Sequence, residues 1–471
     1  MRVYNSLTNK KEEFKPIEDK HITMYVCGPT VYDYSHLGHA RAYIAFDIVN
    51  RYFQYKGYDV NYIQNITDVD DKIINRANES KRDPSEIAEE FTDKFLEDMD
   101  SLGIQRPTHQ PKATDVIPEM IKIIKTLIKK GYAYDVDGDV YFSLKKFENY
   151  GKLSGQTTDQ MKAGARVCVD EKKKDPFDFA LWKKSKPGEP KWESPWGEGR
   201  PGWHIECSAM SMKFGSETLD IHAGGQDLIF PHHENEIAQS EAYTGKPFAK
   251  YWLHNGFVTI NKEKMSKSLG NFFTIRDILK KYSPLAVRFS LLSTSYRSPI
   301  DFSDELLEQA GKAAERLVNT LELLKEGIGS SKEKPYSDDE KKLSETFQKK
   351  KEEFLKAMDD DFNTSEAVAR LFELSTEVHK YLENPDTNSK LLSEALAIFE
   401  DLDQILGLFQ LSKKELPIPE DEINKMIQKR EAARNSKDYA TSDKIRDELL
   451  EKGILLEDQK DGGVRWKVKP K

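Results

Sequence analysis

The sequence contains little cysteine, no long apolar run and no excess of positive charge. Its three cysteines in 471 residues are too few for a disulfide framework, and an odd number is typical of a reducing compartment. Residues 1–13 have no apolar signal core, and no uninterrupted apolar run approaches the roughly 18 residues of a membrane-spanning helix. These absences predict a soluble, cytoplasmic protein that does not contact a membrane. Cys168, which no motif surrounds, is expected to be a buried apolar residue.

The formal net charge of −9 excludes a uniformly basic nucleic-acid coat. Any contact with RNA must therefore come from local basic patches. The length of 471 residues predicts about three domains, and a hydrophobic share of 38% is ample for packed cores.

Residues 22–39 are the stretch around which the rest of the sequence is organised. They begin with apolar and β-branched residues, are interrupted by Gly28-Pro29, and change at Ser35 to the apolar spacing of a helix that ends at Gly57. Residues 60–66 have the pattern of a second buried strand. Strand, helix and strand form a βαβ unit, which predicts a parallel sheet whose ligands bind beyond the carboxyl ends of its strands.

Polar side chains gather at this predicted edge, namely Cys27, His36, His39 and Thr67. On a helix, His36 and His39 share one face, and Gly38 between them has no side chain to keep a flat ligand from the backbone. Two solvated histidines at the start of a helix are an equally simple interpretation.

A second motif, Lys264-Met265-Ser266-Lys267-Ser268, places two ammonium groups and two hydroxyls in one loop before Gly270. Lysine is a compact charge on a flexible stem, suited to following a phosphate during a reaction. Taken alone, the segment fits a solvated basic turn equally well.

Together the two stretches resemble the HIGH and KMSKS signatures of class I aminoacyl-tRNA synthetases, with Leu37 in place of the usual isoleucine. Three further stretches resemble the cysteinyl-tRNA synthetases, and the resemblance covers nearly the whole chain: residues 25–32, 202–208 and 225–236. It implies an α/β fold with a Rossmann-like parallel-sheet catalytic domain that carries an insertion. An α-helical bundle and a small C-terminal α+β anticodon-binding unit are expected to follow.

The resemblance also implies one zinc ion per chain, held by Cys27, Cys207, His232 and Glu236. Zinc takes thiolate, imidazole and carboxylate ligands, and positions 232 and 236 share one face of a helix that is expected to begin near Pro231. The spacing alone leaves the neighbouring His233 and Glu234 open as ligands, and a cysteine is more often a buried apolar residue.

The activity implied is that of a cysteine–tRNA ligase, in which L-cysteine and ATP form cysteinyl-adenylate and pyrophosphate before cysteine passes to tRNA(Cys). The expected catalytic residues, with Mg²⁺ beside the phosphates, are His36, His39, Lys264 and Lys267. ATP is expected to bind at His36, Gly38, His39 and Lys267. The amino acid is expected at Gly28, Thr67, Trp203 and His232. Zinc would select cysteine by binding its thiolate, and a monomer is expected.

The pattern along the chain suggests boundaries for four parts, and the resemblance implies what each part is. Residues 1–114 and 201–303 form the catalytic domain with the KMSKS loop, 115–200 the insertion (connective peptide), 304–412 the helical bundle and 417–471 the anticodon-binding domain. The insertion is expected to contain a hairpin at Asp137-Gly138 and a long surface segment without regular structure over residues 170–202. Bundle helices are expected over residues 304–325, 338–358, 364–382 and 389–408.

In the last part, Arg430, Arg434 and Arg446 beside Trp466 suit an RNA-binding surface, although solvated basic residues and a packed tryptophan are the commoner explanation. Two rival functions remain open. A cysteine-activating ligase of mycothiol synthesis resembles this family in the catalytic half but lacks a terminal anticodon-binding unit, which residues 417–471 predict here. A non-catalytic RNA-binding paralogue would have lost the two signature motifs, and both are present.

Overall fold

The computed structural model describes residues 1–156, 172–260, 263–264, 273–412, 418–458 and 464–468. The expectations for Cys168 and Lys267 therefore lie outside the described residues. The chain divides into two units, Met1–Leu408 and Phe409–Lys471. Among the described helices, none combines the length and the apolar character needed to span a bilayer.

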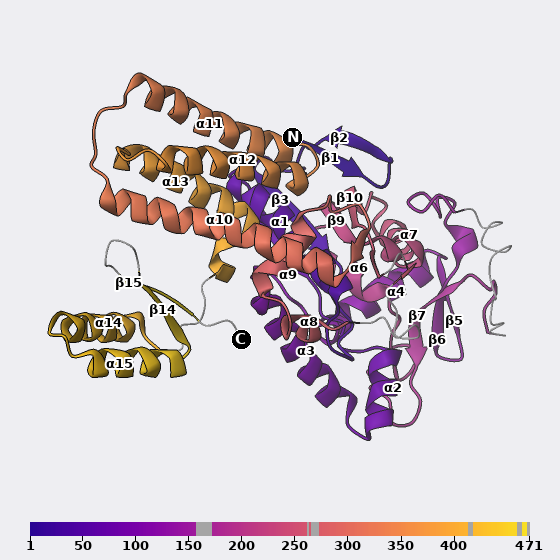
Figure 1. The fold of residues 1–471 in the computed structure, drawn as a ribbon. Coiled ribbons are helices and arrows are strands. Elements are labelled where there is room, and N and C mark those ends of the chain that lie inside the picture. The colour runs from indigo at the N-terminus through magenta and orange to yellow at the C-terminus, as the bar shows by residue number, and fades with distance from the viewer. Residues whose placement is uncertain (157–171, 261–262, 265–272, 413–417, 459–463, 469–471) are drawn as a thin grey trace. The chain divides into compact units, whose positions relative to one another are not determined.

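A four-stranded parallel sheet organises the first unit (Figure 1). Its strands lie in the order β10 (Ala249–Asn255), β9 (Leu219–Gly225), β3 (His21–Val26) and β4 (Asp59–Gln64). Helix α1 (Leu37–Tyr55) carries the chain from β3 to its parallel neighbour β4. The predicted βαβ unit is confirmed. The nearly continuous burial of β3 and β9 is typical of a parallel sheet that is covered on both faces.

The predicted insertion contains a second, antiparallel sheet with the strand order β5 (Ala133–Val136), β6 (Asp139–Phe142), β7 (Phe179–Lys184) and β8 (Gly199–Pro201). The hairpin at Asp137-Gly138 is confirmed, and the two residues have the positive φ angles of 54° and 93° that a tight turn needs. The expectation that residues 170–202 lack regular structure is wrong, because β7 and β8 lie there. Strand β7 is held by pairing with the distant β6, which local composition does not reveal.

Shorter elements complete the first unit. Its other helices are α2 (Asp71–Ser80), α3 (Pro84–Ser101), α4 (Ile117–Lys129), α6 (Ile205–Phe214), α7 (Glu234–Thr244), α8 (Ile275–Leu279) and α9 (Pro284–Leu292). Two small sheets pair β1 (Arg2–Asn5) with β2 (Lys10–Glu13), and β11 (Val258–Ile260) with β12 (Glu263–Lys264) and β13 (Ile300–Phe302).

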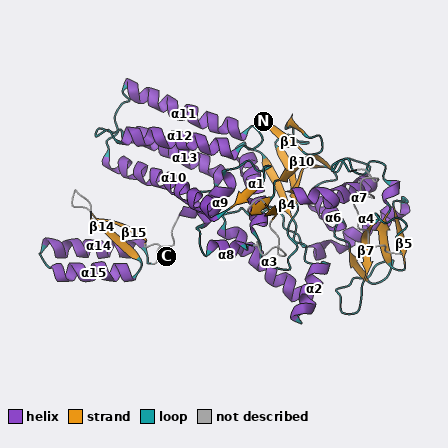
Figure 2. Cartoon of the chain, turned by 45° about the vertical axis from the view of Figure 1, so that its right-hand side comes forward, coloured by secondary structure: helices purple, strands orange, loops and turns teal. Residues whose placement is uncertain are grey.

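Four long helices form the predicted bundle at the end of the first unit (Figure 2). They are α10 (Asp304–Ser330), α11 (Asp338–Met358), α12 (Thr364–Leu382) and α13 (Ser389–Leu406). The bounds of α11 and α12 match the expectation. Helix α13 ends two residues early because Gly407 adopts a left-handed conformation, with a φ of 61°, and caps the helix.

The second unit consists of α14 (Glu420–Asn435), α15 (Tyr439–Glu451), and an antiparallel pair of strands, β14 (Ile454–Asp458) and β15 (Val464–Val468). Helices and strands close around a small apolar core that includes Ile423, Leu449 and Ile454. The predicted α+β unit is thus confirmed.

The side chains expected to contact RNA do not all lie on the surface of this unit. Arg430 is only 4% exposed, and Trp466 packs against the apolar core. Trp466 is therefore a packed tryptophan, as the commoner explanation holds, whereas Arg430 is buried and fits neither the RNA-binding surface nor a solvated basic residue. Arg434 and Arg446 are exposed.

Buried charges join α1 to the end of the bundle. Asp47 on α1 accepts hydrogen bonds from Arg51 at 2.8 Å, from the Gln105 backbone N–H at 2.9 Å, and from Arg288 of α9. Arg288 also donates to the carbonyl of Leu406, at the last turn of α13, at 2.8 Å. The carboxylate of Asp47 is therefore the charge partner that two otherwise uncompensated buried arginines require.

Replacing this carboxylate should destabilise the first unit strongly. Asp47→Asn keeps the shape but leaves Arg51 and Arg288 without a counter-charge, which typically costs about 3–5 kcal/mol. Glu217→Gln is the control, because its ion pair with Lys246 is exposed and should be worth about 1 kcal/mol or less. Urea unfolding followed by far-ultraviolet circular dichroism measures both, and equal shifts of the two midpoints would contradict the assignment.

Candidate functional site

The predicted metal ligands come together beyond the carboxyl end of the parallel sheet. Cys27 directly follows β3, Cys207 lies on α6, His232 precedes α7, and Glu236 lies in its first turn. One sulfur, nitrogen or oxygen atom from each of the four side chains lies within 4.8 Å of every other, and all four residues are buried. A buried cluster of two cysteines, a histidine and a glutamate is compatible with a metal ion.

The segment that carries His232 is not the regular helix expected from Pro231. Ile229–His233 forms a π-helical turn interrupted by the extended Phe230, and the α-helix begins only at Glu234. The residue before a proline is biased toward extended backbone, and Phe230 adopts that conformation. The change leaves the pairing intact, because His232 Nε2 still lies 2.6 Å from Glu236 Oε1.

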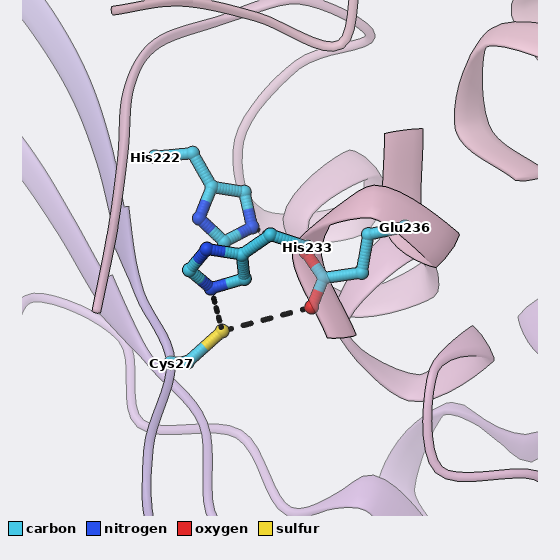
Figure 3. A group of neighbouring side chains, drawn as sticks. All are labelled: Cys27, His222, His233 and Glu236. Atoms are coloured by element: carbon cyan, nitrogen blue, oxygen red, sulfur yellow. Dashed lines mark hydrogen bonds and ion pairs between the residues drawn. The ribbon is translucent and has the colours of Figure 1, made fainter. Parts of the chain in front are cut away.

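A second set of donors shares two members with the first (Figure 3). Cys27 Sγ lies 3.3 Å from His233 Nε2 and 3.6 Å from Glu236 Oε1, and His222 Nε2 lies 2.5 Å from Glu236 Oε2. Because both sets use Cys27 and Glu236, a single ion can take only one of them. His233, which spacing left open, is thus close to Cys27.

Sequence reasoning missed His222. It lies within β9, where a buried strand gives no spacing signal for a ligand. The only hint is its position in the strand that leads into the glycine turn at residues 224–225, one strand away from Cys27.

The protonation of the cluster follows from its burial and its charges. A hydrogen bond from Cys27 lowers the pKa of the Cys207 thiol to about 6, whereas burial raises the pKa of Cys27. Burial opposes the charge of Glu236, but His222 and His232 outweigh it and lower the pKa of Glu236. Burial also opposes the charge of His232, yet Glu236 raises its pKa to about 10. The cluster therefore presents a thiolate and a carboxylate at neutral pH, both suited to a cation.

The two histidines of the first signature form a reciprocal cap at the start of α1. His36 is the N-cap residue, with extended backbone, and not a member of the helix as expected. Its Nδ1 accepts from the His39 N–H at 3.3 Å, and His39 Nδ1 accepts from the His36 N–H at 3.3 Å. The rings stack with centroids 3.8 Å apart and an angle of 18° between their planes. Both residues are half-buried, and both rings take part in the cap of the helix.

This arrangement fixes the tautomers. A ring nitrogen that accepts a hydrogen bond carries no proton, so in the neutral form each proton lies on Nε2. Desolvation and then the nearby charge of His36 lower the pKa of His39, which favours that neutral form. Gly38, which lies between the two histidines in the sequence, is in the first turn of α1 and is half-buried.

The residues expected around the amino acid lie close to the metal-ligand cluster. Trp203 is 38% exposed and its ring stacks on that of His232, with centroids 4.5 Å apart. Thr67 donates its hydroxyl proton to the buried Glu206 at 3.0 Å. At Gly28, an added Cβ would lie 1.6 Å from the backbone oxygen of Asn65, so close packing of two backbones already requires glycine there.

The second signature is described only at its first residue. Lys264 lies in β12, which pairs with β11. The chain is described again from Phe273, and there it hydrogen-bonds to the first signature. The Ile275 N–H donates to the carbonyl of Ser35 at 2.9 Å, and the Leu37 N–H donates to the carbonyl of Phe273 at 3.3 Å. The chain on either side of this loop is thus joined to the cap of α1 and to β11.

Most of the chain matches known protein families. Residues 13–312 match the family described as tRNA synthetases class I (C) catalytic domain, and residues 353–410 match the DALR domain. Residues 418–466 match the cysteinyl-tRNA ligase anticodon binding domain. The chain belongs to the cysteinyl-tRNA synthetase family.

Curated relatives cover the whole of this family member. It is 52% identical to a cysteine–tRNA ligase of Thermodesulfovibrio yellowstonii over 100% of both chains. It is 53% identical to a cysteine–tRNA ligase of Geobacter metallireducens, again over 100% of both chains.

Solved structures support the fold alone. A Mycobacterium tuberculosis methionyl-tRNA synthetase in complex with methionyl-adenylate superimposes with a TM-score of 0.58 at 14% identity, covering 83% of this chain and 90% of its own. A LeuRS of Agrobacterium radiobacter K84, solved as a ternary complex with tRNA and LeuAMS, gives a TM-score of 0.60 at 12% identity, with 86% of each chain covered. The fold of this cysteinyl-tRNA synthetase family member is therefore that of the class I synthetases.

The cap geometry predicts how substitutions at His36 affect stability. His36→Ala removes the acceptor for the His39 N–H and should cost about 1 kcal/mol, whereas His36→Asn supplies a favoured N-cap residue and should cost little. Urea unfolding of the full chain measures the difference. An equal loss of stability in both variants would show that the side chain does not act as the cap.

Proposed function

We propose that this chain ligates L-cysteine to tRNA(Cys) in two steps, through cysteinyl-adenylate. The observation that carries the proposal is the buried cluster of Cys27, Cys207, His232 and Glu236 beside the His36–His39 cap, at the carboxyl edge of a class I synthetase sheet. Relatives that are cysteine–tRNA ligases match the chain from end to end.

In the first step, a carboxylate oxygen of cysteine attacks the α-phosphorus of ATP. The new bond joins that oxygen to phosphorus, the bond from the α-phosphorus to the bridging oxygen breaks, and pyrophosphate leaves with the electron pair. No protein nucleophile is needed, so the work of the protein is positioning and charge stabilisation.

The phosphates fit best beside the cap of α1. His36 and His39 present their Nε2 protons from stacked rings at the N-terminus of a long helix, which favours anions. Lys264 and Lys267 of the second signature would add positive charge as pyrophosphate leaves, and Mg²⁺ would accompany ATP. Gly38 allows ATP to approach the backbone between the two histidines.

The amino acid fits between the cap and the metal-ligand cluster. Trp203 covers the ring of His232, and the hydroxyl of Thr67 lies next to α6, which also bears Cys207. In the second step, the ribose hydroxyl at the 3′ end of tRNA(Cys) attacks the carbonyl carbon of the adenylate, and AMP leaves.

Zinc is the ion that suits the donor set of Cys27, Cys207, His232 and Glu236, because it takes thiolate, imidazole and carboxylate ligands together. When bound, it would supply a Lewis acid that holds the thiolate of cysteine far better than the hydroxyl of serine. The set with Cys207 has two cysteines where the other set has one, and the affinity of zinc for thiolate favours it over the set with His222 and His233. His222 and His233 hydrogen-bond to Glu236 and Cys27, and they fit a role as partners that orient these ligands.

Metal analysis separates the two donor sets. Cys207→Ser removes a thiolate that only the first set contains, and should reduce the zinc bound per chain to near zero. His222→Gln removes a donor that only the second set contains, and should leave most of the zinc in place, at an affinity lowered by about 10- to 100-fold. Full zinc in Cys207→Ser together with loss of zinc in His222→Gln would reverse the assignment.

Two different features argue against the two rival functions. A cysteine-activating ligase of mycothiol synthesis needs no anticodon-binding unit, yet residues 418–466 match one. A non-catalytic paralogue would not retain both signature motifs.

Two assays on one pair of proteins test the function. The full chain should catalyse cysteine-dependent pyrophosphate exchange and charge tRNA(Cys). Deletion of residues 417–471 should spare the exchange and depress charging, because the second unit has its own core and its loss leaves the sheet and the cluster intact. If the deletion abolished both exchange and charging, the second unit would be needed for folding of the rest of the chain. Absence of pyrophosphate exchange in the full chain would refute the function.

A further inference from the structure

One buried carboxylate fastens a loop of the insertion, residues 150–154, to the first turn of α7. Glu234 is 0% exposed, and its Oε1 accepts from the Gly151 N–H at 2.9 Å. Its Oε2 accepts from the N–H groups of Leu153 at 3.1 Å and Ser154 at 2.8 Å. Backbone N–H groups that converge in this way form a concave site for an anion, and here the chain itself supplies the anion. Glu234, which the spacing left open as a ligand, belongs to neither donor set.

The same loop follows α7 for about two turns. The Tyr150 hydroxyl donates to Asn235 Oδ1 at 2.6 Å. Lys152 Nζ lies 2.6 Å from Glu241 Oε2, seven residues after the first contact. The loop also needs glycine, because Gly151 has a φ of 93° and an added Cβ would lie 2.0 Å from a backbone oxygen five residues later. The loop therefore has one defined conformation against α7.

The segment before α7 has little regular structure of its own to hold it in place. Ile229–His233 is a π-helical turn that the extended Phe230 interrupts. The Glu234 N–H donates back to the carbonyls of Ile229 and Pro231 within this turn. Glu234 thus holds the irregular turn through its backbone and the insertion loop through its side chain.

This double attachment lies between two candidate metal ligands. His232 is two residues before Glu234, and Glu236 is two residues after it. A metal site binds tightly when its ligands are ordered before the ion arrives, because their ordering then subtracts nothing from the binding free energy. A shift of the loop would move Glu234 and with it the backbone that carries both ligands.

We propose that Glu234 is a positioning residue through which the insertion sets the affinity of the metal-ligand cluster for zinc. The inference rests on the zinc site of the proposed function. It does not depend on which donor set binds the ion, because Glu236 belongs to both sets.

Zinc binding by the full chain tests the inference, measured by competition with a chelator of known affinity. Glu234→Gln keeps the shape but turns one acceptor oxygen into a donor that faces a backbone N–H. Gly151→Ala displaces the loop while Glu234 stays intact. Each should weaken zinc binding by about 10- to 100-fold, the range for groups that orient metal ligands. In the Glu234→Gln background, Gly151→Ala should add little, because both act through one contact.

Two controls separate positioning from a general loss of stability. Lys152→Met removes an ion pair of the same loop but leaves the three backbone bonds, and should bind zinc as the wild type does. Asp47→Asn destabilises the same unit through Arg51 and Arg288, which lie outside α7 and the loop, and should also keep its zinc affinity. Far-ultraviolet circular dichroism shows that each variant is folded.

Each outcome decides the matter. Wild-type zinc affinity in Gly151→Ala, or in folded Glu234→Gln, would overturn the inference, and so would equal weakening in Asp47→Asn. A wild-type chain that binds no zinc would refute the proposed metal site and this inference with it. If the chain binds zinc but lacks cysteine-dependent pyrophosphate exchange, the proposed function fails, and the zinc affinities of the variants still decide the role of Glu234.

Discussion

The parallel pairing of β3 with β9 is the constraint on which the site depends. The Cys27 N–H donates to the carbonyl of Ala223 at 3.0 Å, and the two strands are in register from Met24 opposite Ile221. Strand β3 precedes the insertion in the sequence and β9 follows it, so this pairing joins the two parts of the chain on either side of the insertion. It brings a cysteine at the end of one strand to the turn that begins the segment with His232 and Glu236. All candidate ligands then lie at one edge of the sheet.

Buried charge is handled in opposite ways at the two ends of α1. The carboxylate of Asp47 forms ion pairs with Arg51 and Arg288, so these charges are compensated within the protein. The same cluster connects α1 to α9 and α13. Beyond the other end, Cys27, Cys207 and Glu236 face buried histidines; Glu236 raises the pKa of His232, whereas burial lowers the pKa of His233 and of His254. A buried thiolate and carboxylate with so little compensating charge are costly unless a cation joins them. The same principle therefore makes the first cluster structural and the second a candidate for metal.

The sequence predicted those features that local physics decides. Helices α11 and α12 match their expected bounds because their apolar stripes and N-caps are local signals, and the hairpin at Asp137-Gly138 follows from the positive φ that this dipeptide tolerates. Strand β7 was missed because pairing with a distant strand holds it, and His222 because a single histidine in a buried strand has no periodic partner. The candidate ligands were predicted only through resemblance to a family, since their spacing in the chain is too wide for any local pattern.

The spacing of the first signature has a physical explanation in the cap of α1. The N-cap and N3 positions of a helix lie three residues apart, and a capping box joins their side chains and backbone N–H groups reciprocally. His36 and His39 occupy these positions, and the Nδ1 of each imidazole accepts a hydrogen bond from the backbone N–H of the other residue. The two rings also stack, with their centroids 3.8 Å apart, so the cap holds the imidazoles against each other. Any residue inserted between them would break the box and separate the rings. The distance between two candidate phosphate donors is therefore set by the geometry of helix capping, and the chemistry of the site begins at the first turn of α1.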